Sequence, residues 1–322
     1  MNAVLTDDEI GVLLSAAVHA PSIHNSQPWR FEVHGPVVDV RLDEERILPV
    51  SDPAGRAARI ATGAAVFNVR VAAAMLGHES RTAIDPDPAR PDVVARLFLT
   101  SRTVPIPGLS SLYREIARRR TYRGPLLDQP VSDQVLDRLR RAALAEDVTL
   151  RTLTADERAH LAGILRRAES DELHDEDELH ERQVWVGGDR TAEGVPTGAL
   201  GPVPVRPAFV RDLAAGFAAE QRGEAVFETD PLIVVLTTPD EDPATWVQAG
   251  IALQHVLLVA TSYGLTASFL DQVLERGDAR HRLRDLIGGH AWPQLVLRLG
   301  FPAQAGDRTG RRDWHESFDQ WF

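Results

Sequence analysis

A pattern of helices and strands occurs twice along this chain, and the repetition constrains the fold more than any other feature of the sequence. Residues 6–17 read TDDEIGVLLSAA, and residues 132–143, which lie 126 positions later, read SDQVLDRLRRAA. Thr6 and Ser132 can each accept a hydrogen bond from a free backbone N–H of a first helical turn, and Glu9 completes a capping box with Thr6. The shared spacing of apolar residues therefore predicts an amphipathic helix in both segments.

Two further matches extend the repeat. Residues 63–77 match residues 250–264, and both segments are mostly apolar and end in glycine, which predicts two long helices. Residues 93–99 match residues 295–301, with Arg96 opposite Arg298, and both segments have strand character. The separation of matching positions grows from 126 to 187 between the first two matches, so the second copy carries 61 additional residues.

The mixed order of helices and strands in each copy predicts an α+β fold. We expect a first unit at residues 1–107 and a second at residues 108–322, fused into an intramolecular pseudo-dimer. A site between two such units would draw residues from both of them.

The additional residues form an insertion at about 156–226. It contains the acidic run 169–182, a stretch rich in Gly and Pro from 187 to 207, and a segment at 209–221 that we expect to be helical. The acidic run is typical of a solvated helical face. The alternative is a regulatory or covering role, with the insertion acting as a lid over a site.

The composition excludes several classes of chemistry. The formal charge is −12, which argues against a nucleic-acid-binding protein. The chain has no cysteine, and all 35 basic residues are arginine, so a thiol nucleophile, a lysine Schiff base and a P-loop lysine are all excluded. No motif predicts a metal site.

The N-terminal residues lack the pattern of a secretory signal, and no apolar segment is long enough to predict a membrane span. We therefore expect a cytoplasmic protein.

Two polar segments distinguish the copies and are candidates for a functional site. The first copy has the loop 20–31, APSIHNSQPWRF, while the second is preceded by a predicted helix that ends in Arg118, Arg119, Arg120 and Arg123. Clustered guanidinium groups repel one another unless an anion or carboxylates neutralise them, and they suit a phosphate. The alternatives are a loop that only makes a turn, and a helix end at which arginines interact with the helix dipole.

These segments carry a resemblance to a known family. Arg119-Arg-Thr-Tyr-Arg123, the loop Pro21-Ser-Ile-His-Asn-Ser-Gln-Pro-Trp29 and the segment Gly264-Leu-Thr-Ala-Ser268 resemble the FMN-dependent nitroreductase family. Ordinary members place the arginine motif before the loop, in a half-length chain that forms a homodimer. The reversed order here resembles the tandem, Acg-like subfamily, in which two units are fused and share the motifs.

The resemblance implies an FMN site with specific roles. Arg119 and Thr121 would bind the phosphate or the ribityl chain, Arg123 would reach the pyrimidine edge of the ring, and the basic pair Arg311-Arg312 would close over the phosphate. Ser22, His24 and Asn25 would approach from the other unit, and residues 266–269 would line the ring. The full predicted set is Ser22, His24, Asn25, Gln27, Arg119, Arg120, Thr121, Arg123, Ala267, Ser268, Phe269, Arg311 and Arg312.

The family further implies an oxidoreductase that transfers electrons through FMN from NAD(P)H to a nitroaromatic, quinone-like or other acceptor. No catalytic side chain is required, because the cofactor carries the chemistry. The alternative is an FMN storage or sequestration protein in which the insertion covers the flavin and limits turnover. One chain would hold one FMN and act as a monomer or a homodimer.

Overall fold

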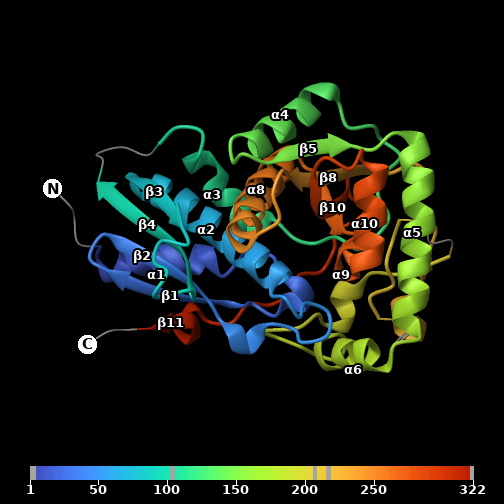
Figure 1. Ribbon diagram of the computed structural model, residues 1–322, viewed down its shortest axis with the longest axis horizontal. Helices are drawn as coiled ribbons and strands as arrows, with labels where there is room; N and C mark the ends of the chain where they lie inside the picture. The colour runs from blue at the N-terminus through green and yellow to red at the C-terminus, as the bar shows by residue number, and fades with distance from the viewer. Residues whose placement is uncertain (1–4, 102–105, 206–208, 215–218, 320–322) are drawn as a thin grey trace.

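The computed structural model describes residues 5–101, 106–205, 209–214 and 219–319, and it has an α+β fold built on two main sheets (Figure 1). The first sheet has the strand order β11-β1-β2-β4-β3, and the second has the order β5-β8-β10-β9. Two long helices, α2 (Arg56–Leu76) and α8 (Pro243–Ser262), lie between the sheets at the centre of the molecule. The predicted α+β class is confirmed.

The helices and strands predicted from the repeat are present, although α2 and α8 each begin seven residues before the matched segments at 63 and 250. In the first half these are α1 (Asp7–Ala17), β1 (Trp29–His34), β2 (Val37–Leu42), α2, β3 (His78–Ile84) and β4 (Val93–Ser101). In the second half they are α4 (Asp133–Leu144), β5 (Thr149–Thr152), β8 (Leu232–Thr238), α8, β9 (Thr266–Phe269) and β10 (Trp292–Gly300). The capping box predicted at Thr6 is present, and the Ser132 hydroxyl accepts a hydrogen bond from the N–H of Val135 at 3.4 Å.

Corresponding strands occupy the same places in the two sheets. The order β1-β2-β4-β3 in the first matches the order β5-β8-β10-β9 in the second, and every one of these neighbours is antiparallel. The aligned arginines both form ion pairs: Arg96 on β4 binds Asp39 at 2.6 Å, and the fully buried Arg298 on β10 binds Glu228.

Helices α2 and α8 cross at two glycines that are equivalent in the repeat. A Cβ atom on Gly63 would lie 2.1 Å from the backbone oxygen of Val247, and one on Gly250 would lie 1.9 Å from the backbone oxygen of Ile60. Both distances are too short for any side chain, so only glycine permits this approach. Ile60 and Val247 are also 187 positions apart, so the two contacts are reciprocal, as in a two-fold symmetric interface.

A second pair of contacts between these helices is reciprocal as well. The Gln254 amide donates a 2.7 Å hydrogen bond to Oδ1 of Asn68, and the ring of Phe67 stacks on that of His255 with 4.6 Å between centroids. Phe67 and Gln254 are 187 positions apart, and so are Asn68 and His255. Each of the two contacts is therefore the equivalent of the other in the repeat. All four side chains therefore hold the two halves at a fixed relative position.

Part of the insertion packs against the face of the second sheet that is turned away from α8 (Figure 1). It comprises α5 (Ala155–Leu173), α6 (Glu176–Trp185), the short helix α7 (Ala219–Arg222), and the parallel pair β6 (Val203–Pro204) and β7 (Glu224–Ala225). Most of the acidic run 169–182 is exposed or half-buried, as expected, but Glu172, Glu181 and Arg182 are buried. The interpretation as a purely solvated face is wrong at these three positions, because Glu172 binds Arg182 and Glu181 accepts hydrogen bonds from residues 50 and 51.

Among the described residues, the helix expected at 209–221 is present only at the end of that segment. Residues 209–214 are not helical, residues 215–218 lie outside the described residues, and only the last three positions belong to α7. The physical reason is that side chains of this stretch bury in different directions. Phe209 packs against the second sheet, whereas Leu213 and Ala214 pack in a separate cluster under the loop 186–200.

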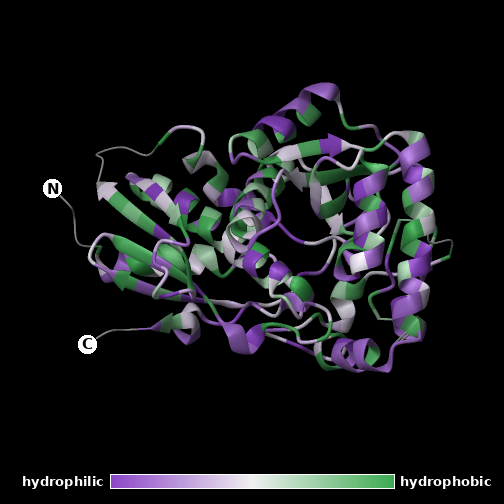
Figure 2. Cartoon of the chain, in the orientation of Figure 1, coloured by the Kyte–Doolittle hydropathy of each residue, from purple (hydrophilic) through white to green (hydrophobic). Residues whose placement is uncertain are grey.

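Helices α2 and α8 are long and apolar enough, by length and composition alone, to cross a membrane. This corrects the expectation that no segment would meet that test. In the most apolar windows of the two helices, 78% and 61% of the residues are buried inside the protein. Figure 2 shows their apolar residues in the interior, which is the pattern of core helices.

The C-terminal tail returns to the first sheet. It passes through a short 3₁₀ turn, Trp314–Ser317, and ends in β11 (Phe318–Asp319), which pairs in parallel with β1 through Phe31 and Phe318. Trp314 packs against the core of the first half. The residues just before this docked segment, 308–312, are thereby carried past the loop 20–31.

Candidate functional site

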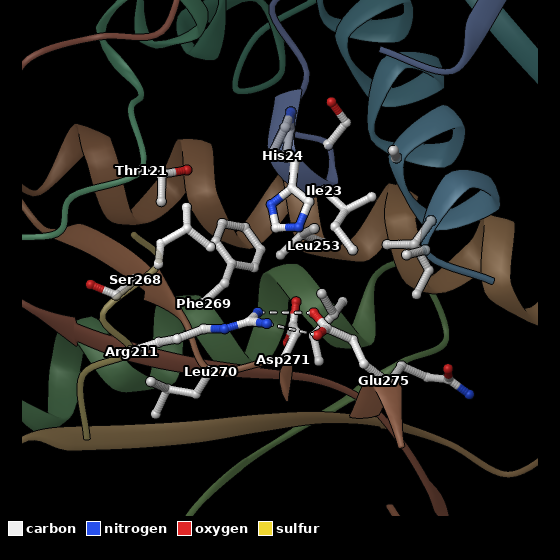
Figure 3. Close-up of a pocket in the computed structure, with 18 of the residues that line it drawn as sticks. Ile23, His24, Thr121, Arg211, Leu253, Ser268, Phe269, Leu270, Asp271 and Glu275 are labelled. Atoms are coloured by element: carbon white, nitrogen blue, oxygen red, sulfur yellow. Dashed lines mark hydrogen bonds and ion pairs between the residues drawn. The ribbon is translucent and has the colours of Figure 1, made fainter. Parts of the chain in front are cut away.

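A partly enclosed cavity of about 130 Å³ lies where the two halves meet (Figure 3). The first half contributes the loop 21–24 and the start of α2, and the second half contributes Thr121, Arg123 and the segment 268–271. Most of its wall is apolar, with Ile23, Leu253 and Phe269 among the lining residues. This cavity is called the ring cavity below.

The loop 20–28 adopts a strained conformation around the cavity. His24, Asn25 and Gln27 have φ values of 47°, 59° and 55°, a region that side-chain-bearing residues rarely adopt. Such strain persists only where surrounding contacts hold it, and it occurs often at functional sites. Here the Ser22 hydroxyl accepts a 3.0 Å hydrogen bond from the N–H of Gln27, which closes the loop.

The polar side chains of this loop divide into two groups. Ser22 and His24 line the ring cavity. Asn25 and Gln27 bind protein instead: the Asn25 amide donates to the carbonyls of Gly194 and Gly310 at 3.1 Å, and the Gln27 amide donates to that of Ala192 at 2.8 Å. The first group can contact a ligand, whereas the second fastens the insertion and the C-terminal tail over the loop.

His24 points into the ring cavity from the strained loop (Figure 3). Its imidazole is buried, and its pKa lies well below the usual value because burial disfavours the charged form and Arg211, Arg182 and Arg123 add to this effect. The ring is therefore neutral at pH 7. It can offer one N–H donor and one acceptor to a bound molecule.

The segment 266–269 forms the opposite wall. The N–H of Tyr122 donates to the carbonyl of Ala267 at 2.8 Å, and the Ser268 hydroxyl donates to the carbonyl of Tyr122, so residues 121–122 extend the edge of β9. Ser268 and Phe269 line the ring cavity, while Ala267 lines a different cavity.

An arginine-rich cavity of about 230 Å³ adjoins the ring cavity, and Thr121 and Arg123 line both. We call it the phosphate cavity. Five arginines line it: Arg119, Arg120, Arg123, Arg308 and Arg311. Within the described ranges, none of these five forms an ion pair with a carboxylate.

Burial of these unpaired charges is unfavourable, and the pKa values reflect it. Burial and the nearby Arg311 and Arg308 lower the pKa of Arg119 to about 9, and burial lowers the pKa values of Arg123 and Arg311 to about 10. The Nε atoms of Arg119, Arg120 and Arg311 are buried without a hydrogen-bond partner. An anion bound among them would supply both the missing charge and the missing acceptors.

The two arginines of the C-terminal pair point to different places. Arg311 lines the phosphate cavity, and its guanidinium donates to Oδ1 of Asn25 at 3.0 Å and to the carbonyl of Ala20 at 3.1 Å. Arg312 lies outside that cavity in a separate surface depression, where its Nε donates to Glu316 at 3.2 Å.

A further set of charged residues lies at the ring cavity and was not predicted from the sequence. Arg211, from the insertion, binds Glu275 at 3.1 Å (Figure 3) and Glu172 at 2.7 Å, and these carboxylates raise its pKa against the effect of burial. Asp271 lies beside them and is half-buried, and desolvation of its carboxyl raises its pKa to about 7. No motif marks these residues, because only the packing of the insertion against α9 (Gln272–Glu275) brings them together.

Comparison with known proteins gives consistent matches. The model of the Nitroreductase family matches residues 116–301. The chain is 31% identical over 322 residues to "Putative NAD(P)H nitroreductase acg" of Mycobacterium tuberculosis (strain ATCC 25618 / H37Rv), a match that covers 98% of this chain and 97% of that protein. It is 31% identical over 304 residues to "Putative NAD(P)H nitroreductase Rv3131" of the same strain, covering 94% of this chain and 88% of that protein.

Solved structures with a similar fold include a nitroreductase with bound FMN from Bacteroides fragilis NCTC 9343. The sequence identity is 14%, the match covers 62% of this chain and 94% of that chain, and the TM-score is 0.39.

Proposed function

The chain belongs to the nitroreductase family, and from this premise we propose that it is an oxidoreductase that binds FMN at the junction of its two halves. The family resemblance predicted from the sequence is confirmed by these matches. Its relatives are named as NAD(P)H nitroreductases, so we propose NAD(P)H as the electron donor. A nitroaromatic or quinone-like compound is the proposed acceptor.

The observation that carries the proposal is the continuity of two unlike cavities. The ring cavity is mostly apolar, and the phosphate cavity beside it is lined by five arginines without carboxylate partners among the described residues. A flavin mononucleotide has the same two ends, a flat aromatic ring and a phosphate. The buried and unpartnered Nε atoms of Arg119 and Arg311 fit a phosphate that accepts several charge-assisted hydrogen bonds.

We assign roles to the predicted residues on this basis. Arg119, Arg120 and Arg311 would bind the phosphate, and Thr121 and Arg123, which line both cavities, would bind the middle of the molecule. Ser22, His24, Ser268 and Phe269 would surround the ring, while Asn25, Gln27 and Ala267 support these elements from behind. Arg312 has no part in the binding of FMN in this proposal.

FMN, when bound, would supply the transfer of electrons between NAD(P)H and the acceptor. The chain's own residues would bind the cofactor, keep water away from it and shape the space above it. His24 would do so as a neutral hydrogen-bonding group, since its lowered pKa excludes an imidazolium at pH 7.

We further propose that the chain is an intramolecular pseudo-dimer of units 1–107 and 108–322. The reciprocal contacts at Gly63 and Gly250 and the matching strand orders support this reading. Because the site takes residues from both units, a single chain would be complete with one FMN. We therefore expect a functional monomer.

The alternative, an FMN storage or sequestration protein, is supported by the insertion. Val210, Arg211 and Leu213 line the ring cavity, and buried ion pairs to Glu172 and Glu275 hold Arg211 there. In this position the insertion restricts access to the ring cavity and would limit turnover with NAD(P)H.

The test is the visible spectrum of the freshly purified protein with quantification of released FMN, followed by anaerobic addition of NADH or NADPH. We expect one FMN per chain and bleaching of the flavin absorbance. Bound FMN that does not bleach would favour storage. A chain that neither contains nor takes up FMN would overturn the proposal.

A further inference from the structure

A third cavity adjoins the phosphate cavity and is lined by the first two residues of β9, Thr266 and Ala267. It has a volume of about 150 Å³ and shares Arg119, Arg120 and Arg308 with the phosphate cavity, but it shares no residue with the ring cavity. Its remaining wall comes from Arg118, from residues 264–267 and from the last turn of α8, including Thr261. The phosphate cavity thus adjoins both the ring cavity and the third cavity, which do not adjoin each other.

The charge of the region exceeds what one flavin phosphate would neutralise. A phosphate monoester carries about two negative charges at pH 7. Five arginines line the phosphate cavity, and none of them forms an ion pair with a carboxylate within the described ranges. About three positive charges therefore remain after one phosphate is bound, and two of the arginines that can carry them, Arg120 and Arg308, also line the third cavity.

Unpartnered polar atoms gather at the third cavity as well. Nε of Arg119, Nε of Arg120 and the hydroxyl of Thr266 are all buried without a hydrogen-bond partner, and all three residues line it. The arginines are not there to cap α8, because the carbonyls of Ala260 and Thr261 already accept hydrogen bonds from the backbone N–H groups of residues 263–265. With Nε of Arg119 assigned to the FMN phosphate, the Nε–H of Arg120 and the hydroxyl of Thr266 are left over, and they suit an anion with several oxygens.

We propose that the third cavity is a second anion subsite that takes a phosphate or diphosphate group next to the phosphate of bound FMN. This inference rests on the proposed function, which places the FMN phosphate in the phosphate cavity. Such a group has two possible sources. It is either a free inorganic anion bound beside FMN, or the continuation of a flavin dinucleotide whose first phosphate occupies the FMN position.

The test uses the FMN-loaded protein and inorganic pyrophosphate in a calorimetric titration. Thr261 lines the third cavity only, so Thr261→Glu places a carboxylate among the arginines of this subsite, and Thr261→Gln is the matched uncharged control. We expect one pyrophosphate to bind the wild type and Thr261→Gln. In Thr261→Glu the affinity for pyrophosphate should fall at least about tenfold, while FMN remains bound in all three proteins.

Titration of flavin-free protein with FMN and with FAD separates the two sources. If the dinucleotide is the ligand, FAD binds at least as tightly as FMN, and Thr261→Glu weakens FAD but not FMN. If the ligand is a free anion, only the pyrophosphate binding responds to the substitution. Equal behaviour of Thr261→Glu and Thr261→Gln in both titrations would overturn the subsite.

The experiment distinguishes failure of the proposed FMN site from failure of the anion subsite. A chain that binds no FMN would refute the flavin site, yet the pyrophosphate titration of that flavin-free chain would still decide the subsite through the comparison of the two variants.

Discussion

Replacement of Arg119 by methionine should change stability and flavin binding in opposite directions. Arg119 is buried among Arg311 and Arg308, and its pKa falls from 12.5 to about 9. At pH 7 the guanidinium is still protonated, so the folded flavin-free protein carries the full unfavourable free energy of this buried charge. Methionine has a similar length and no charge, so it removes that cost while it keeps most of the packing.

The magnitude follows from the size of the pKa change. A fall from 12.5 to about 9 corresponds to about 5 kcal/mol at 1.36 kcal/mol per pKa unit. The substitution also removes the 3.3 Å hydrogen bond from Arg119 to the carbonyl of His19. This loss reduces the expected gain in stability by about 1 kcal/mol. We therefore expect Arg119→Met to raise the free energy of unfolding of flavin-free protein by about 1 to 4 kcal/mol, allowing for relaxation around the charge.

The pH dependence gives a second readout with a defined sign. A basic group with a lowered pKa in the folded state binds fewer protons there than in the unfolded chain between pH 9 and 12.5. The wild type therefore gains stability relative to Arg119→Met as the pH rises above about 9. The advantage of the variant should be largest at pH 7 and should shrink at pH 10.

The assay is urea unfolding of flavin-free protein at both pH values, followed by a titration with FMN. Loss of one charge-assisted hydrogen bond of roughly 1.5 to 3 kcal/mol should weaken FMN binding by about 10- to 150-fold. Arg282→Met is the control, since Arg282 is an exposed arginine on α10 (Gly277–Leu286) paired with Asp278, and it should alter neither quantity appreciably. If flavin-free Arg119→Met proves less stable than the wild type, the reasoning about unpaired buried charge is wrong.

Three further substitutions test other parts of the structure. Gly250→Ala would place a Cβ atom 1.9 Å from a backbone oxygen of α2, so we expect thermal unfolding to show a loss of more than about 3 kcal/mol of stability, or a protein that does not fold. The control is Gly11→Ala in α1, which should be neutral or stabilising because the nearest atom to its Cβ would lie at 3.8 Å. A mild effect of Gly250→Ala would contradict the close crossing of α2 and α8. Asp271→Asn should stabilise the flavin-free protein more at pH 8 than at pH 5, because desolvation raises the pKa of this carboxyl from 3.8 to about 7. The wild type loses stability as the pH rises through that window, by at most about 4 kcal/mol, and an equal effect at both pH values would argue against a raised pKa. Arg311→Gln should raise the Kd for FMN by about 10- to 100-fold in a fluorescence titration, whereas Arg312→Gln should leave it nearly unchanged, and equal effects would refute the assignment of only Arg311 to the phosphate cavity.

Local rules accounted for the elements of the repeat. The Thr6 capping box and the Ser132 cap mark helix starts through hydrogen bonds within four residues, and glycines near the ends of α2 and α8 mark where those helices stop. Such signals depend on neighbours in the chain, so they can be read without the fold. The prediction of a helix was wrong at residues 209–214 for the opposite reason. The conformation of these residues depends on distant partners in two different hydrophobic clusters.

The candidate site divides in the same way. The arginine stretch and the loop 20–31 are recognisable from their residues. The structure places Thr121 and Arg123 in the wall of the ring cavity with His24 and in the wall of the phosphate cavity with Arg119. The separation of Arg311 from Arg312 could not be read from adjacent letters. It follows from the path of the tail, which directs one side chain toward Ala20 and the other toward Glu316.

By itself, the sequence determined the α+β class, the helix ends that caps and glycines mark, and the two segments that carry the family motifs, and it predicted the duplication that we propose. Only the tertiary structure decided the reciprocal crossing of α2 and α8, the buried position of Arg211 between Glu172 and Glu275, and the lack of carboxylate partners that leaves five arginines available to an anion within the described part of the chain. The physical reason is the range of the interactions. Caps and periodicity act over a few residues, whereas burial, close approach of backbones and ion pairing depend on which distant segments share the same space.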